Sequence, residues 1–222
     1  MNRGRVPQST PSSAHYPPVK SLLDKTVSGL LLVLLSPVLG FVLIAMGVNR
    51  IVARRDRGPF LYRETRLSMG EEFDLLKFRT LRHAALTRQA GEEAHARLLE
   101  SDPDNLTWAG RRILKPWYLD ELPQLLNVVK GDMSLVGPRP WPPSMAEAQL
   151  EKGLTYRNEL PAGWTGLAQV QKDRQEPARY TDLDLEYVTA CRTLSPLGLA
   201  RYDLGILWQT VKLMARGEGL RY

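Results

Sequence analysis

Residues 26–49 read TVSGLLLVLLSPVLGFVLIAMGVN, an apolar stretch without one charged side chain. As a helix it would be about 36 Å long, enough to cross a hydrocarbon layer of about 30 Å. The run is longer than the apolar part of a signal peptide, and no small-residue cleavage site follows it. The sequence therefore predicts a membrane segment over residues 20–49.

Two features of this segment argue against a straight crossing. Pro37 lies in the middle of the run and bends a helix, and the Ser36 hydroxyl is placed to bond the backbone groups that the bend frees. Basic residues flank both ends, which draws both ends toward the cytoplasm: Lys20 and Lys25 precede the run, and Arg50, Arg54, Arg55 and Arg57 follow it. A re-entrant helical hairpin satisfies both features, and a proline-kinked single crossing is the alternative.

Length and composition limit the organisation of the chain. Its 222 residues suffice for one catalytic unit with an anchor. The net charge of +6 fits an anionic membrane surface, a phosphorylated substrate or nucleic acid, and the single Cys191 excludes an internal disulfide framework. We expect a disordered arm over residues 1–19, a re-entrant membrane helix over residues 20–49, and a cytosolic, membrane-associated catalytic domain over residues 50–222.

The remainder reads as a mixture of helices and short strands. Strands are predicted at residues 60–63 and 73–79, and an exposed helix with ion pairs at residues 87–100. Further helices are predicted at residues 182–191 and 203–214; the last has the composition of an interfacial amphipathic helix or of a core helix. The predicted fold class is α/β, mainly helical, with a re-entrant hairpin before a small catalytic domain that carries interfacial amphipathic helices.

One helix is specified more fully than the others. Asp120 occupies an N-cap position, Glu121 and Pro123 fall in the first turn, and Gly131 ends the helix. Apolar residues recur at helical spacing and predict a buried face: Leu122, Leu125, Leu126 and Val129. The N-terminal end of this helix therefore carries two adjacent acidic residues.

A proline-rich stretch follows Gly137 and predicts a stiff, non-helical loop. Its prolines are Pro138, Pro140, Pro142 and Pro143. Arg139 lies between two of them. Its side chain either contacts phosphate or faces solvent.

The run LDELPQLLNVVKGDMSLVGPRP, residues 119–140, resembles the signature of the monotopic phosphoglycosyl transferases, the bacterial sugar transferase family. Shorter matches stand in the family's order and extend the resemblance over about residues 20–214. They are Ser36 and Pro37; Lys77, Phe78, Arg79 and Thr80; Thr165, Gly166 and Gln169 within TGLAQV; and the region of Leu183, Asp184, Tyr187 and Val188.

The chain departs from the family pattern at three places. Members often have Arg five residues before the acidic pair, where Lys115 keeps the charge and loses two-pronged phosphate contact. Residues 161–166 and 171–174 differ from the motifs that are usual there. These differences leave the preferred nucleotide and sugar undetermined.

The resemblance implies a two-step reaction at Asp120 and Glu121, the catalytic pair. Asp120 would attack the sugar-bearing phosphorus of a nucleotide-sugar, expected to be a UDP-sugar, and form a covalent aspartyl phosphosugar. Polyprenyl (undecaprenyl) phosphate would then accept the sugar phosphate. Mg²⁺ is the implied cofactor, at Asp120 and Glu121, and phosphate contacts are expected from Arg79, Lys115 and Arg139.

The implied location is the bacterial inner membrane, with the catalytic domain on its cytoplasmic face and membrane lipids as partners. The implied role is to initiate synthesis of exopolysaccharide, O-antigen or another glycoconjugate. The sequence leaves open whether the chain forms a homo-oligomer.

Other interpretations remain at this point. Asp120 and Glu121 can be read as a helix cap and a favourable first-turn charge, and Lys77 with Arg79 as one solvated face of a strand. The chain can also be read as a non-catalytic membrane scaffold of a polysaccharide-assembly complex. A nucleic-acid binder is suggested by the charge alone, and we expect no nucleic-acid partner because no such motif is present.

Overall fold

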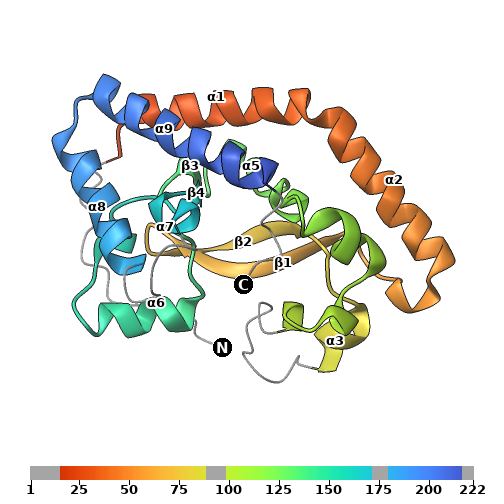
Figure 1. Cartoon of the computed structure of the whole chain (residues 1–222). Helices are drawn as coiled ribbons and strands as arrows, with labels where there is room; N and C mark the ends of the chain where they lie inside the picture. Colours follow the sequence, from red (N-terminus) through yellow and green to blue (C-terminus); the bar gives the residue numbers. More distant parts are fainter. Residues whose placement is uncertain (1–15, 89–98, 172–179, 217–222) are drawn as a thin grey trace. The chain divides into compact units, whose positions relative to one another are not determined.

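The computed structural model describes residues 16–88, 99–171 and 180–216, and helices dominate this part of the chain (Figure 1). The longer helices are α1 (Pro18–Leu34), α2 (Ser36–Val52), α3 (His83–Arg88), α5 (Gln124–Lys130), α6 (Pro143–Leu150), α7 (Leu167–Val170), α8 (Tyr180–Thr193) and α9 (Pro196–Ala215). Two small sheets contain β1 (Leu61–Ser68) with β2 (Glu71–Phe78), and β3 (Ser134–Val136) with β4 (Gly163–Thr165). The α/β, mainly helical class is confirmed. Most of the predicted arm and of the predicted helix at residues 87–100 lies outside the described residues.

The chain divides into two compact units, each assembled from separate stretches. The first unit takes the described parts of residues 1–26, 65–73 and 128–208. The second unit takes those of residues 27–64, 74–127 and 209–222. Helices α1, α5 and α9 each run from one unit into the other.

The β1–β2 hairpin confirms both predicted strands and lengthens the first. Its turn residues, Met69 and Gly70, both have positive φ, as a two-residue hairpin turn requires. Ion pairs join the second unit's part of the strands: Lys77 Nζ lies 3.3 Å from Glu64, and Arg63 lies 3.5 Å from Asp74. Because β1 is highly charged, apolar alternation did not indicate its full length.

Strands β3 and β4 pair in parallel in the first unit, and three glycines permit their close approach. A Cβ atom on Gly163 would lie 2.2 Å from the amide nitrogen of Gly137, and one on Gly166 would lie 2.2 Å from the carbonyl oxygen of Gly137. Gly137 N donates to Thr165 O at 3.0 Å. The predicted motif residues Thr165 and Gly166 thus form part of the packing that supports the proline-rich loop.

That loop is non-helical only as far as Pro142, because α6 begins at Pro143. The prediction that Pro143 belongs to the stiff loop is wrong. Proline suits the first turn of a helix, where its missing N–H would have no helical partner.

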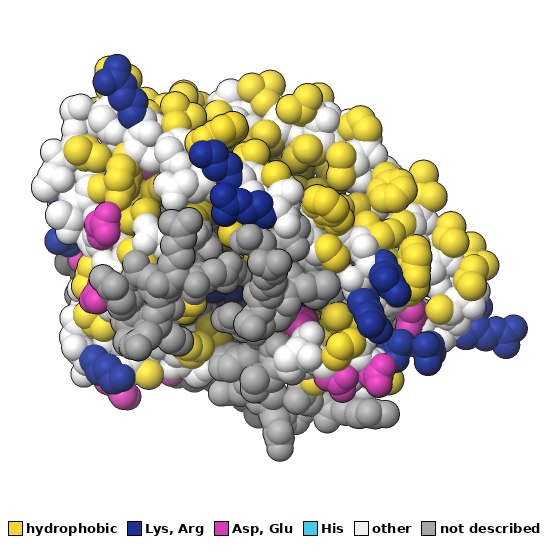
Figure 2. All heavy atoms as spheres, in the orientation of Figure 1, with side chains coloured by type: hydrophobic (Ala, Val, Ile, Leu, Met, Phe, Trp, Pro, Cys, Tyr) yellow, Lys and Arg dark blue, Asp and Glu magenta, His cyan; other side chains and the backbone are white. Residues whose placement is uncertain are grey.

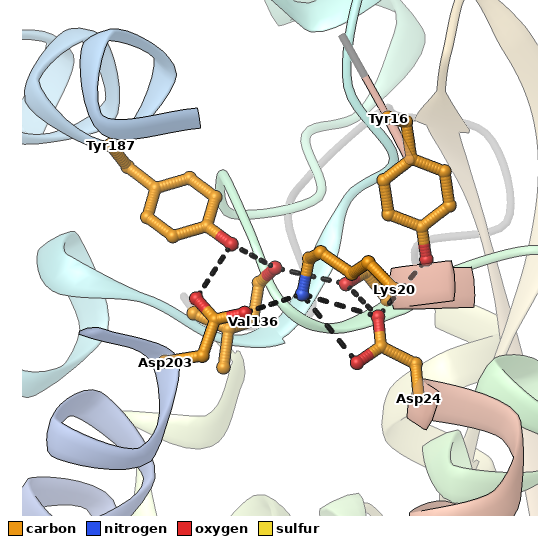
Figure 3. A network of polar contacts seen from close by, with 7 residues as sticks. Tyr16, Lys20, Asp24, Val136, Tyr187 and Asp203 are labelled. Atoms are coloured by element: carbon orange, nitrogen blue, oxygen red, sulfur yellow. Dashed lines mark hydrogen bonds and ion pairs between the residues drawn. The ribbon is translucent and has the colours of Figure 1, made fainter. Parts of the chain in front are cut away.

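A buried polar network joins the start of α1 to α8, α9 and β3 in the first unit (Figure 3). Lys20 Nζ lies 2.7 Å from Asp203 and 3.3 Å from Asp24. The Tyr187 hydroxyl lies 2.9 Å from both Asp203 Oδ1 and the carbonyl oxygen of Val136. Because Lys20 lies between two carboxylates, its charge is neutralised inside the protein.

The apolar segment forms two helices that meet at Leu35. Among the described residues, no single helix is long and apolar enough to cross a bilayer. Helices α1 and α2 have the necessary length and composition only when taken together, and the pair is bent by 59°. The predicted break is confirmed, although α2 begins at Ser36 with Pro37 in its first turn. The Ser36 hydroxyl makes no hydrogen bond among the described residues, so the predicted compensation by Ser36 is absent.

Helix α1 buries polar side chains and exposes apolar ones. Its buried residues, Lys20, Asp24 and Ser28, recur every fourth position and share one face. Leucines and valines on its other faces are largely exposed, with 65% of Leu30 and 74% of Val33 accessible. Figure 2 shows hydrophobic side chains gathered along α1 and α2.

Candidate active site

Asp120 lies in a single 3₁₀ turn, Leu119–Glu121, in the second unit. The prediction that it caps a helix is wrong, because α5 begins only at Gln124. Tyr118 directly before the turn has φ of 53°, a left-handed conformation that is uncommon for a bulky residue and recurs at functional sites. The carboxylate is therefore placed by a strained turn rather than by a helix end.

Asp120 ends a chain of buried polar contacts. Its Oδ2 lies 3.0 Å from Lys115 Nζ, and the same Nζ lies 2.7 Å from Glu100 Oε2. The Thr80 hydroxyl donates to the other Glu100 oxygen at 3.0 Å. Lys115 is thus shared between the carboxylates of Asp120 and Glu100, and the predicted motif residue Thr80 binds the Glu100 carboxylate.

Burial raises the pKa of Asp120 to about 6, although Lys115 acts in the opposite direction. The residue is only 2% exposed, so loss of hydration outweighs the attraction of the ammonium group. The negative charges of Glu121 and Glu100 raise the pKa further, while the charge of Lys77 lowers it. Asp120 therefore lies in a buried but charged environment, where it takes up a proton at a higher pH than a free aspartate does.

A π-helical turn, Gly110–Leu114, delivers Lys115 to this position. A side chain on Gly110 would have its Cβ 2.4 Å from the carbonyl oxygen of Thr80, so glycine permits this approach. Lys115 N donates to Gly110 O at 3.0 Å and ends the turn. Single π-helical turns are rare and are frequent at functional sites.

Arg79 has a structural role that the sequence did not indicate. Its buried guanidinium donates to three backbone carbonyls: Pro59 at 2.8 Å, Leu81 at 2.6 Å and Asp56 at 2.6 Å. These contacts fix the entry and exit of the β1–β2 hairpin in the second unit. They occupy Nε, Nη1 and Nη2, so this geometry does not support the predicted phosphate contact of Arg79.

Helix α5 is attached to β2 through Asn127, a residue that the sequence analysis did not single out. Its side-chain oxygen accepts from Leu76 N at 3.0 Å and its amide donates to Asp74 O at 2.8 Å. The buried apolar face of this region differs from the predicted one: Leu122, Leu125 and Val128 are buried, whereas Leu126 and Val129 are exposed. The predicted face was therefore wrong for two of its four residues.

The predicted residues of the proline-rich loop and of the TGLAQV motif lie in the first unit. Arg139 has an exposed side chain, Pro138 is buried before it, and Pro138 O accepts from Gly163 N at 2.8 Å. Gln169 has a buried side-chain oxygen that meets no hydrogen-bond partner in the described part of the chain. The phosphate contact of Arg139 stays a prediction.

The acidic groups around Asp120 fit a magnesium ion that arrives with a substrate. Mg²⁺ is commonly bound through one or two carboxylates together with water and phosphate oxygens. Asp120 and Glu121 offer such oxygens, and no group of three or more His, Cys, Asp or Glu suited to a metal occurs among the described residues.

Comparisons with known proteins give one consistent family. A family model described as bacterial sugar transferase matches residues 15–217. The chain is 36% identical over 183 residues to the undecaprenyl-phosphate glucose phosphotransferase of Komagataeibacter xylinus. These residues cover 77% of this chain and 32% of that protein. It is 38% identical over 155 residues to the UDP-glucose:undecaprenyl-phosphate glucose-1-phosphate transferase of Caulobacter vibrioides, covering 68% of this chain and 53% of that one.

A third relative is similar in extent to this chain. The exopolysaccharide production protein ExoY of Rhizobium meliloti is 31% identical over 212 residues, which cover 90% of this chain and 87% of that protein. The chain thus spans about a third to a half of the length of the first two relatives and most of the third.

Proposed function

We propose that this chain, which belongs to the bacterial sugar transferase family, transfers a sugar-1-phosphate from a UDP-sugar to undecaprenyl phosphate through Asp120. The observation that carries the proposal is the buried Asp120–Lys115 pair at the start of the family signature. Named relatives act on UDP-glucose and undecaprenyl phosphate, which supports these substrate classes. By the same similarity, we place the reaction at the start of exopolysaccharide synthesis.

In the first step, an Asp120 oxygen attacks the phosphorus that bears the sugar. An O–P bond forms to the carboxylate, and the diphosphate P–O bond breaks, so that the nucleoside monophosphate leaves with the electron pair. In the second step, an oxygen of undecaprenyl phosphate attacks the same phosphorus. The acyl phosphate bond then breaks and regenerates the Asp120 carboxylate.

The attack requires Asp120 to become accessible. With 2% of the residue exposed and Lys115 Nζ 3.0 Å from it, the nucleophile is covered in this conformation. A substrate diphosphate competes with Asp120 for Lys115, because phosphate oxygens bind ammonium groups strongly. We infer that substrate entry draws Lys115 from Asp120 to phosphate and frees the carboxylate.

Asp120 and Glu121 are the residues that would hold a Mg²⁺ ion, which would supply positive charge against the phosphates of the substrate. The local charges favour a cation here, because Glu100 and Glu121 add negative charge beside Asp120, and Lys115 contacts Asp120 and Glu100. Glu121 follows Asp120 directly in the turn, so its carboxylate would hold the ion while Asp120 attacks.

The inverted surface of α1 supports a membrane-embedded hairpin. In water, a helix buries its apolar face, whereas α1 buries Lys20, Asp24 and Ser28 and exposes Leu30 and Val33. Such an arrangement is stable where the outer medium is itself apolar. We therefore propose that α1 and α2 enter the inner membrane from its cytoplasmic face and return to it, which places the reaction beside its lipid substrate.

Replacement of Asp120 tests the chemistry. Purified protein in nanodiscs is incubated with UDP-glucose and other UDP-sugars, undecaprenyl phosphate and Mg²⁺, and UMP and lipid product are measured. Asp120→Asn is expected to lower turnover by at least about a thousandfold, because the nucleophile is lost. Asp74→Asn is the matched control, since Asp74 forms an exposed ion pair with Arg63 in the same unit and should keep full activity.

The covalent intermediate gives a second readout. Without undecaprenyl phosphate, mass spectrometry should find a phosphosugar on the peptide that contains Asp120, and none in Asp120→Asn. Turnover that survives in Asp120→Asn would exclude the aspartate mechanism. A folded wild-type protein that transfers no sugar phosphate from any UDP-sugar would favour the scaffold interpretation.

A further inference from the structure

The loop that presents Arg139 is held at nearly every residue of its backbone within the first unit. Gly137 N donates to Thr165 O at 3.0 Å, and Gly163 N donates to Pro138 O at 2.8 Å. Beyond Arg139, Leu67 N donates to Trp141 O at 3.0 Å. The backbone on both sides of Arg139 is therefore fixed while its side chain stays exposed.

Arg139 itself is fixed by two buried residues that form an ion pair. Arg157 Nη1 donates to the carbonyl oxygen of Arg139, and the Asp184 carboxylate accepts from the amide of Arg139. Arg157 Nη2 and Asp184 Oδ2 lie 2.6 Å apart. The Arg157–Asp184 ion pair thus binds both the backbone carbonyl and the backbone N–H of Arg139.

The ion pair is itself supported on several sides. Arg157 Nε donates to Gln149 at 2.8 Å, and its guanidinium lies 4.2 Å from the centre of the Trp141 ring. The Tyr156 hydroxyl donates to Asp184 at 3.2 Å. Arg157 and Asp184 are 8% and 3% exposed, so both charges are buried and depend on these partners.

Burying an ion pair is costly, and an exposed loop side chain needs no such support for stability alone. Tight positioning is useful where a cationic side chain must bind an anionic group with little loss of conformational freedom. We propose that Arg157 and Asp184 are positioning residues, which hold Arg139 so that its guanidinium binds a phosphate of a substrate. This inference rests on the proposed function, and the phosphate belongs to the UDP-sugar or to undecaprenyl phosphate.

A double-mutant cycle tests this role. Arg157→Lys keeps the charge and loses the forked contacts, so the KM of the substrate that Arg139 binds should rise about tenfold with kcat changed less than about twofold. Arg139→Ala should raise the same KM at least as much. In the Arg139→Ala background, Arg157→Lys should have less than about a twofold further effect, because its action passes through Arg139.

Separate titrations of the UDP-sugar and of undecaprenyl phosphate identify which substrate carries the phosphate. Tyr156→Phe is a milder variant that removes one contact of Asp184, and a rise of about threefold in the same KM is expected. Arg192→Lys is the control, because Arg192 forms a more exposed ion pair with Glu159 in the same unit and should leave both KM values unchanged.

Additive effects of Arg157→Lys and Arg139→Ala, or losses confined to kcat, would reject the positioning role. Thermal unfolding of each variant shows whether a loss merely reflects misfolding, and Tyr156→Phe carries the test if Arg157→Lys does not fold. A wild-type protein without transferase activity would instead reject the proposed function before the cycle begins.

Discussion

Asp120 lies in a buried setting that disfavours the ionised form its chemistry requires. Burial favours the protonated carboxyl group, whereas attack on phosphorus requires the ionised form. Since the pKa is about 6 in the fold and 3.8 for a free aspartate, this group's stabilising effect is fully present below about pH 4 and is lost as the pH rises through about 6. Folding and reactivity therefore make opposite demands on one side chain.

Asp120→Asn is accordingly expected to stabilise the protein at alkaline pH. Asparagine stays neutral, and Lys115 keeps Glu100 as a partner at 2.7 Å. At pH 8 the variant should exceed the wild type in free energy of unfolding by about 1 to 3 kcal/mol, and the difference should shrink toward pH 4. Urea unfolding in detergent at both pH values measures this. A variant less stable than the wild type at pH 8 would show that the Lys115 contact outweighs burial.

The same pKa predicts how the first chemical step depends on pH. At UDP-sugar concentrations far below KM, UMP release should increase through about pH 6 and level off above it, because the rate then reports the ionised fraction of Asp120 in the free enzyme, where Lys115 still contacts it. Lys115 lowers this pKa, so Lys115→Gln should move the midpoint to higher pH, while Lys115→Arg should move it much less. Stopped-flow or quench-flow measurement between pH 5 and 8 tests both. An unchanged midpoint in Lys115→Gln would show that the ionisation of Asp120 does not cause the pH dependence.

Sequence reasoning identified Asp120 and Lys115, missed Glu100, and named Thr80 only as part of a motif. Glu100 contacts Lys115, and Thr80 contacts Glu100, through tertiary contacts that no periodicity encodes. Arg79 was assigned to phosphate because a cation in a family motif suggests an anionic ligand. Its carbonyl partners could be found only from the folded backbone.

The bounds of helices and strands could not be predicted where local geometry overrides the spacing of apolar residues. Asp120 has the residue type of an N-cap, yet its carboxylate contacts Lys115 and the helix begins after Pro123. Strands β3 and β4 have three residues each, too few for an alternating pattern to be recognised. In contrast, the helix predicted at residues 182–191 lies within α8 and differs from its bounds by two residues at each end, whereas α9 begins at Pro196 and not at residue 203.

The glycines between β3 and β4 provide a test of this packing. In Gly163→Ala, the new Cβ would lie 2.2 Å from the backbone of Gly137, and backbone cannot move aside as a flexible side chain can. We expect a loss of about 2 to 4 kcal/mol in the free energy of unfolding. Gly205→Ala in α9 is the control, since apart from the adjacent backbone of its own helix no described atom lies within 4 Å of its Cβ position, and alanine favours a helix. Equal thermal stability of the two variants would contradict the close approach.

For the molecule as a whole, the apolar segment and its break were predictable, but the polar face of α1 was not. Lys20 was read as a flanking charge that marks the cytoplasmic side, whereas the fold pairs it with Asp24 and Asp203. Lys25 remains exposed at that end, and Arg50, Arg54, Arg55 and Arg57 are exposed at the other. The charge argument for a hairpin therefore depends more on the end of α2 than on the start of α1.

A cysteine-accessibility scan decides between the hairpin and a single crossing. In a Cys191→Ser background, single cysteines replace Val19, Leu34 or Val52, which are 62%, 73% and 78% exposed and lie at the start, bend and end of the two helices. Burial raises the pKa of the native Cys191 thiol to about 11, so its removal should alter labelling little.

In inside-out vesicles, a membrane-impermeant maleimide should label positions 19 and 52 alike and leave position 34 protected, because the bend lies in lipid. Right-side-out spheroplasts should leave all three unlabelled, and detergent solubilisation should expose position 34. Labelling of position 19 and position 52 from opposite sides would replace the hairpin with a kinked single crossing. The site at Asp120 would then need another route to its lipid substrate, since one end of the bent pair would face the periplasm.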